Sequence, residues 1–132
     1  MKEIMKRKKI IWFLRIVASS ILLQTLFFKF SGAEESIYIF SKLGMEPYGR
    51  IGSGIAELIA ATLILIPKTT WMGALLGCGI MSGAVLSHLF VLGIAVKNDG
   101  GLLFVLALIV LLCCLELIHL SKTKIFNLLK AK

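Results

Sequence analysis

Four stretches of the sequence are long and apolar enough to cross a membrane as α-helices. They cover residues 10–28, 49–66, 71–96 and 101–120. Each span needs about 20 mostly apolar residues, and only a helix satisfies its own backbone hydrogen bonds where water is absent. Hydrophobic residues make up 58% of the 132 residues, and the mean hydropathy of +0.95 is too high for a water-soluble domain. The sequence therefore predicts a single domain over residues 1–132, an all-α integral membrane four-helix bundle.

The placement of basic residues predicts how this bundle is oriented. Ten lysines and arginines lie in the tail 1–9, the second loop and the tail 121–132, whereas four flank or occupy the first and third loops. Basic residues favour the cytoplasmic side, so both termini are predicted to be cytoplasmic. The net charge of +8 does not indicate nucleic acid, because contact with anionic lipid is sufficient to explain basic tails. Membrane lipid is the expected partner.

An alternative interpretation treats the first apolar run as a secretory signal. The small residues Ser31, Gly32 and Ala33 would then form the cleavage site. Arg15 inside the run and Lys29 just before the site argue against cleavage. We therefore expect an uncleaved first span, whereas cleavage would leave three spans and a mature N-terminus outside.

The longest connection, residues 29–48, is predicted to contain a short interfacial helix in the first outer loop. Ser31 and Glu34 match the capping box that often starts a helix, and Gly44 is typical of a helix end. Apolar residues between these signals recur at helical spacing, namely Ile37, Phe40 and Leu43. We expect this apolar side to cover the mouth of the bundle or lie among lipid headgroups, with Glu35 toward water.

Short turns and small residues predict how the second, third and fourth spans pack. The connections at residues 67–70 and 97–100 are too short for anything but tight reversals, so these spans should be antiparallel neighbours. Small residues recur four apart in the third span, in the pairs Gly73 with Gly77 and Gly79 with Gly83. Small residues at this spacing let helix backbones approach closely in lipid. The pattern predicts that the third span is the central packing helix.

Polar residues inside or at the ends of the spans are the candidate functional residues. A charged residue costs about 2.5 to 3.5 kcal/mol to insert, so each one needs a partner, a wet cavity or a function. Those predicted to meet in the outer half of the membrane are Gln24, Lys29, Arg50, Glu57 and His88. At 1.5 Å per residue, Glu57 and His88 lie at similar depths, about 10 Å from the outer ends of their spans. The mixture of cations, carboxylate and imidazole predicts a small polar pocket that binds a ligand or a proton.

The sequence leaves two roles open for Glu57. It either forms a buried ion pair with Arg50 or Lys29 that sets helix register, or it transfers protons or binds a ligand. His88 is either a hydrogen-bonded packing residue or the partner of Glu57 in a proton-exchanging pair, which would suit a quinone-like ligand.

Two further sets of residues are expected to be structural. Arg15 and Glu116 lie near cytoplasmic ends and are expected to pair or to reach the interface. Cys78, Cys113 and Cys114 fall inside spans, have no metal-ligand spacing and are expected to pack as small apolar residues. No metal site is predicted, and no residue can be given a catalytic role.

Three motifs follow one another along the spans. They are Lys29-Phe30-x-Gly32, Gly54-x-x-Glu57 and Met81-x-x-Ala84-x-x-x-His88. Their order and spacing, from Arg15 to about Leu112, resemble those of the DoxX family of small four-helix bacterial membrane proteins. The resemblance implies a location in the bacterial cytoplasmic (inner) membrane and an association with quinone-linked oxidoreductases. It also implies that Lys29, Glu57 and His88 are the matching polar positions, while the longer outer segment 37–50 suggests a subgroup.

From the residues and the resemblance we expect an auxiliary membrane subunit that is not catalytic alone. It would bind a small lipophilic or anionic ligand, with a quinone as the candidate cofactor. Its protein partners would be other copies of the chain, as a homo-oligomer, or the subunits of a redox complex. Two alternatives remain, which are a small proton-coupled transporter with Glu57 and His88 on its pathway, and a purely structural membrane partner.

Overall fold

The computed structural model describes residues 2–96 and 100–121. Its elements are α1 (Lys2–Phe30), α2 (Glu34–Lys42), α3 (Tyr48–Leu65), α4 (Thr70–Ser87), the π-helix η1 (His88–Leu92) and α5 (Leu102–Leu120). Four helical segments are long and apolar enough to cross a membrane: Met5–Phe30, Tyr48–Leu65, Thr70–Leu92 and Leu102–Leu120. The predicted all-α four-helix membrane bundle is therefore confirmed, and the described residues contain no strand.

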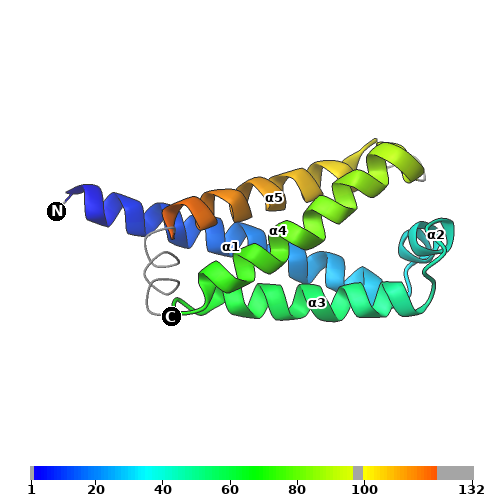
Figure 1. Ribbon diagram of the computed structural model, residues 1–132, viewed down its shortest axis with the longest axis horizontal. Coiled ribbons are helices and arrows are strands. Elements are labelled where there is room, and N and C mark those ends of the chain that lie inside the picture. The colour runs from blue at the N-terminus through cyan, green and yellow to red at the C-terminus, as the bar shows by residue number, and fades with distance from the viewer. Residues whose placement is uncertain (1, 97–99, 122–132) are drawn as a thin grey trace, which may run out of the picture.

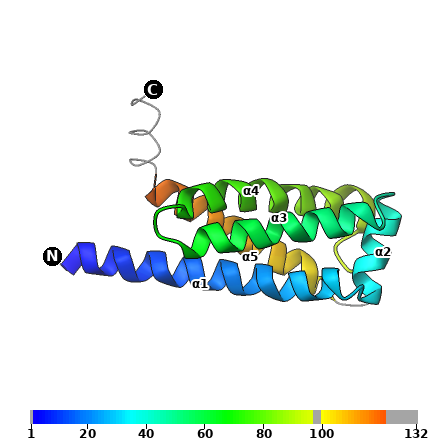
Figure 2. The same ribbon diagram turned by 90° about the horizontal axis from the view of Figure 1, so that it is seen from below.

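Successive long helices run in opposite directions along the bundle (Figures 1 and 2). α1 packs against α3 and α5, and α4 packs against the same two helices. α3, α4 and α5 are therefore antiparallel neighbours, as their short connections predict. The prediction that the third span is central is wrong, because α1 has the same two principal neighbours as α4.

The two ends of the bundle differ. α2 lies across one end, called here the α2 end, whereas α1 begins and α5 finishes at the other, called here the terminal end (Figure 2). α1 has 29 residues. At 1.5 Å per residue this is about 43 Å, which exceeds the roughly 30 Å of a hydrocarbon core. Its basic first turns accordingly extend beyond the other long helices at the terminal end (Figure 1).

Small and branched apolar side chains fill the core of the bundle, and large ones face outward. Buried positions include Ala18, Leu22, Ala60, Ala61, Ile64, Ala74, Val110 and Leu117. In contrast, Phe13, Phe27, Phe90 and Leu112 are each between 64% and 77% exposed. Such a large apolar surface is uncommon on a soluble monomer but suits contact with lipid chains. The arrangement supports membrane lipid as the surroundings of the four long helices.

The glycines of α4 are not equivalent in packing. A side-chain carbon placed on Gly73 would lie 2.6 Å from the backbone nitrogen of Ile64 and 2.7 Å from the carbonyl oxygen of Ala60. The backbones of α3 and α4 therefore touch at Gly73, where only a glycine fits. At Gly79 and Gly83, no other part of the described structure comes within 4 Å of the same point. Those two glycines face away from the bundle.

The predicted interfacial helix is present as α2, although it starts differently. The residue before its first turn is Ala33, which makes no side-chain capping bond. Ser31 instead donates its hydroxyl to the carbonyl oxygen of Phe28 at 3.4 Å, so the capping box predicted to start at Ser31 is wrong. Phe40 is buried and Glu35 is exposed. Phe40 and Glu35 therefore match the predicted orientation of α2, whereas Ile37, on the predicted apolar side, is 38% exposed.

The sequence predicts that the third span ends at residue 96, but its helix ends earlier. After Ser87 the α-helix widens into η1, and η1 ends at Leu92. Gly93 follows with a φ of +81°, a conformation that residues with side chains rarely adopt. The predicted turn 97–100 and tail 121–132 lie outside the described residues, except for Gly100 and Ser121.

Candidate functional site

An ion pair between α1 and α3 lies near the α2 end of the bundle. The ammonium group of Lys29, in the last turn of α1, pairs with Oε1 of Glu57 in α3. The same ammonium group donates a hydrogen bond to Oγ of Ser53 at 2.9 Å. Ser53 and Glu57 are four residues apart and so share one face of α3. One lysine therefore bonds to two successive turns of the neighbouring helix.

A hydroxyl group completes the partners of the buried carboxylate. Oγ1 of Thr25 lies 3.2 Å from Oε2 of Glu57 and 2.9 Å from the carbonyl oxygen of Leu22, so its single proton is shared between two acceptors, while Oε1 accepts from Lys29. The Glu57 side chain is 1% exposed and that of Lys29 is 16% exposed. We call Thr25, Lys29, Ser53 and Glu57 the Lys29–Glu57 cluster. Its two opposite charges compensate each other, and in the described part of the chain no buried side-chain nitrogen or oxygen lacks a hydrogen-bond partner.

The aromatic ring of Phe40 brings α2 into contact with this cluster. The ring centroid lies 5.6 Å from the ammonium nitrogen of Lys29, within the range of a cation–π attraction. Phe40 is itself buried. The charged end of Lys29 thus lies between the carboxylate of Glu57 and an apolar ring, in a position where water is largely excluded.

Arg50 lies next to the cluster, but its described hydrogen bonds go to Glu46 and to the backbone of Lys29, not to the carboxylate of Glu57. Its Nε lies 3.0 Å from both carboxylate oxygens of Glu46, one turn earlier. Its Nη1 donates to the carbonyl oxygen of Lys29 at the end of α1. Of the two cations that the sequence offers as partners for Glu57, the structure therefore selects Lys29. Arg50 ties the end of α1 to the start of α3.

The structure leaves Gln24 outside the site. The Gln24 side chain is exposed on α1, and the neighbouring Thr25 makes the contact with Glu57 instead. Thr25 is four residues before Lys29 and therefore lies on the same helical face. The four-residue spacing from Lys29 could have been recognised in the sequence, and it predicts that Thr25, and not the more polar Gln24, lies beside Lys29.

His88 is buried, but its described contacts lie elsewhere. Its Nδ1 lies 3.0 Å from the carbonyl oxygen of Gly93, just past the end of η1. Its ring meets Phe104 of α5 edge to face, with the ring centroids 5.6 Å apart. Among the described residues, no hydrogen bond joins His88 to Glu57. The geometry favours a packing role for His88 over the proton-exchanging pair with Glu57.

Arg15 does not pair with Glu116, which was one of the two arrangements that the sequence suggested. It is 2% exposed, and its Nε donates to the carbonyl oxygen of Ile64 at 2.7 Å while Nη2 donates to that of Leu65. Both carbonyls belong to the end of α3, where helix geometry leaves them without backbone partners. The ring centroid of Trp12 lies 3.9 Å from the guanidinium carbon. Arg15 thus caps α3, while Glu116 is exposed on α5.

Substituting Arg15 by Met should lower the free energy of unfolding by about 2 kcal/mol, because two charge-assisted bonds to helix-end carbonyls are lost. Detergent-solubilised protein unfolded with increasing SDS provides the measurement. Glu116→Gln is the matched control, and this exposed change should stay within about 0.5 kcal/mol of wild type. Equal effects of the two substitutions would contradict the capping role.

The described side chains of the types that bind metal ions do not cluster. Among the described residues, no group of three or more histidine, cysteine, aspartate or glutamate side chains could hold a metal ion. The three cysteines are free, with Cys113 and Cys114 buried and Cys78 partly buried. Sγ of Cys114 lies 2.8 Å from the point that a side-chain carbon on Gly77 would occupy. This close contact is consistent with a packing role for Cys114.

Comparison of the chain with models of protein families, with curated proteins and with solved structures finds no match. Functional inference therefore starts from the geometry of the Lys29–Glu57 cluster and from the motifs that contain Lys29, Glu57 and His88.

Proposed function

We propose that this chain is a DoxX-like protein of the bacterial cytoplasmic membrane, and an auxiliary, non-catalytic subunit of a quinone-linked redox system. The direct contact between Lys29 and Glu57 is the observation that carries the proposal. These residues come from two separate motifs of the resemblance, and the ion pair joins them in one cluster. A charged side chain inside a membrane is costly unless it is paired with an opposite charge or has a function.

The chemistry of Lys29 suits a ligand that accepts hydrogen bonds. An ammonium group has three donor hydrogens, and within the described residues Ser53 and Glu57 account for two of them. Lys29 also retains 16% exposure, whereas Glu57 retains only 1%. A quinone carbonyl oxygen would accept the third hydrogen, beside the buried ring of Phe40, whose centroid lies 5.6 Å from the same ammonium nitrogen.

The proposed orientation places the Lys29–Glu57 cluster on the outer side of the membrane. We place both termini in the cytoplasm on the basis of the basic tails, which puts the α2 end in the outer half of the membrane. The protein partners would be redox subunits or further copies of the chain.

The test is native mass spectrometry of the gently purified protein, comparing wild type, Glu57→Gln and the control Glu116→Gln. We expect a co-purified quinone on wild type and on Glu116→Gln. On Glu57→Gln its occupancy should fall about tenfold, because loss of the carboxylate frees the ammonium group of Lys29 to move toward the interface. Equal occupancy in all three proteins, or no quinone in any, would overturn the proposal.

A structural role is the second candidate, and one observation favours it. The polar groups of the cluster satisfy one another without any ligand, and the ion pair joins the two neighbouring helices α1 and α3. In that case Glu57→Gln would alter stability alone. A proton-dependent flux in liposomes that Glu57→Gln abolishes would instead favour the transporter alternative, which needs a proton pathway through the bundle.

A further inference from the structure

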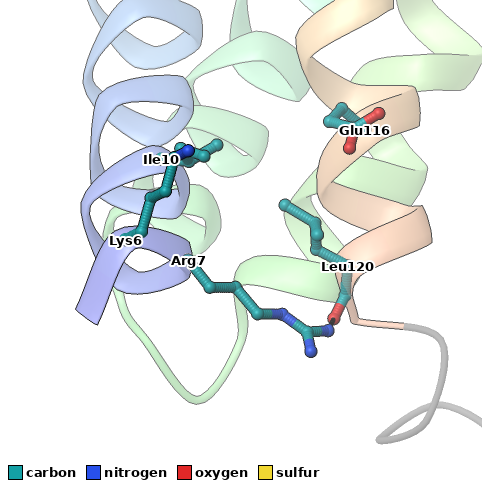
Figure 3. Close-up of a pocket in the computed structure, with 5 residues that line it drawn as sticks. All are labelled: Lys6, Arg7, Ile10, Glu116 and Leu120. Atoms are coloured by element: carbon teal, nitrogen blue, oxygen red, sulfur yellow. Dashed lines mark hydrogen bonds between the residues drawn. The ribbon is translucent and has the colours of Figure 1, made fainter. Parts of the chain in front are cut away.

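A pocket opens at the terminal end of the bundle, far along the helices from the Lys29–Glu57 cluster. Its volume is about 320 Å³, and it lies between the start of α1 and the end of α5. Its lining consists of Lys6, Arg7 and Ile10 from α1, together with Glu116 and Leu120 from α5. Figure 3 shows Arg7 reaching from α1 toward Leu120 across the gap between the two helices.

The charges of this pocket favour an anion. Two of its lining residues are cations and one is a carboxylate. Arg7 is oriented, because its Nη2 donates to the carbonyl oxygen of Leu120 at 2.8 Å. A guanidinium group carries five donor hydrogens in a planar fork, and the bond to Leu120 uses one of them. Arginine with lysine is a combination that suits a phosphate group.

The apolar part of the pocket continues into the surface that faces lipid. Ile10 is 44% exposed, and Phe13, one turn further along α1, is 66% exposed. Leu112 lies four residues before Glu116 on the same face of α5 and is 64% exposed. Exposed apolar side chains therefore follow the pocket residues along both helices. A free phosphate ion gains nothing from such side chains, whereas the acyl chain of a lipid packs against them.

The depth of the pocket also matches a lipid headgroup. Lys6 and Arg7 begin the basic run that continues through Lys8 and Lys9, directly before the apolar part of α1. This is the junction where the hydrocarbon core gives way to headgroups. Basic pockets between membrane helices at this depth are known to hold anionic headgroups.

We propose that this pocket binds one anionic phospholipid, with its phosphate on Lys6 and Arg7 and an acyl chain along Ile10 and Phe13. Glu116, on the opposite wall, accepts a hydrogen bond from a headgroup hydroxyl. This assigns the pocket to a hydroxyl-bearing anionic lipid such as phosphatidylglycerol. The lipid joins α1 to α5 at the end of the bundle where α1 extends beyond its neighbours.

The test is a titration of the delipidated full chain in detergent with phosphatidylglycerol, followed by native mass spectrometry. Lys6→Gln combined with Arg7→Gln should weaken the first bound lipid about tenfold or more, because both phosphate ligands are lost. Lys8→Gln combined with Lys9→Gln removes the same charge outside the pocket lining and should change the affinity less than about threefold. Lys6→Gln alone keeps the bond between Arg7 and Leu120, and should still weaken binding measurably.

Three results would overturn this proposal. Equal weakening by the two double substitutions would mean that the lipid responds to the basic run as a whole. Equal affinity for phosphatidylcholine and phosphatidylglycerol would mean that the cations do not select the headgroup. Displacement of phosphatidylglycerol by millimolar inorganic phosphate would mean that the pocket takes the free ion. The SDS unfolding curve of each variant shows whether the fold is retained.

Discussion

Replacing Lys29 by Met should lower the free energy of unfolding by about 3 kcal/mol or more. Removing one partner of a buried ion pair leaves the other charge uncompensated, which costs about 3 to 5 kcal/mol. The side chain left behind is Glu57, which is 1% exposed and keeps only the hydroxyl of Thr25 among its described partners. SDS unfolding in mixed micelles, with helical signal as the readout, measures the change.

The reverse substitution, Glu57→Gln, should have the smaller effect, about 1 kcal/mol. Its amide oxygen still accepts from Thr25, and the flexible lysine stem lets the charge of Lys29 move toward the interface. Replacing both Lys29 and Glu57 by Met should return the stability to within about 1 kcal/mol of wild type, because no buried charge remains. The cycle of single and double variants isolates the pair. A Lys29→Met protein as stable as wild type would show that the pair contributes nothing to folding.

Replacing Gly73 by Leu should destabilise the bundle by about 3 kcal/mol or more, since overpacking of a tight contact forces helices apart. The contact at this position is with backbone atoms, the nitrogen of Ile64 and the carbonyl oxygen of Ala60. A backbone cannot change rotamer to make room, so α3 and α4 must separate. The loss of folded protein is measured by size exclusion chromatography and by SDS unfolding.

Gly79→Leu is the matched control on the same helix. Nothing in the described structure outside α4 lies within 4 Å of the side-chain carbon that it would add. Leucine is also the better helix former, by up to about 1 kcal/mol relative to glycine. Gly79→Leu should therefore be neutral or stabilising. If Gly79→Leu were the more damaging of the two, the exposed face of α4 would have to pack against something other than lipid.

The parts of the fold that could be predicted are those governed by local pattern. Each span follows from an apolar run, and the short turn at residues 67–70 requires α3 and α4 to be antiparallel. α2 follows from the helical spacing of Ile37, Phe40 and Leu43. The start of α2 was harder to predict, because a capping motif shows that a serine is able to cap a helix but does not exclude other hydrogen-bond partners. At Ser31 the carbonyl oxygen of Phe28 is the partner.

Among the candidate site residues, contact partners were harder to predict than depth. Lys29, Glu57 and Arg50 are close together near the α2 end, as the sequence suggested, yet only Lys29 pairs with Glu57. Arg15 shows the same limitation at the other end of α3. The sequence suggested that Arg15 pairs with Glu116 or reaches the interface, but unpaired carbonyls at the end of a helix also accept hydrogen bonds from arginine.

Hydropathy and residue order alone require four membrane-spanning helices, because a backbone in lipid has to satisfy its hydrogen bonds within each span. The rotation of each helix about its own axis, in contrast, depends on all of its neighbours together. One residue corresponds to about 100° of rotation. That single step separates Gln24, which is exposed, from Thr25, which bonds to Glu57. Only the packing of α1 against α3 and α5 decides which of these two side chains enters the bundle.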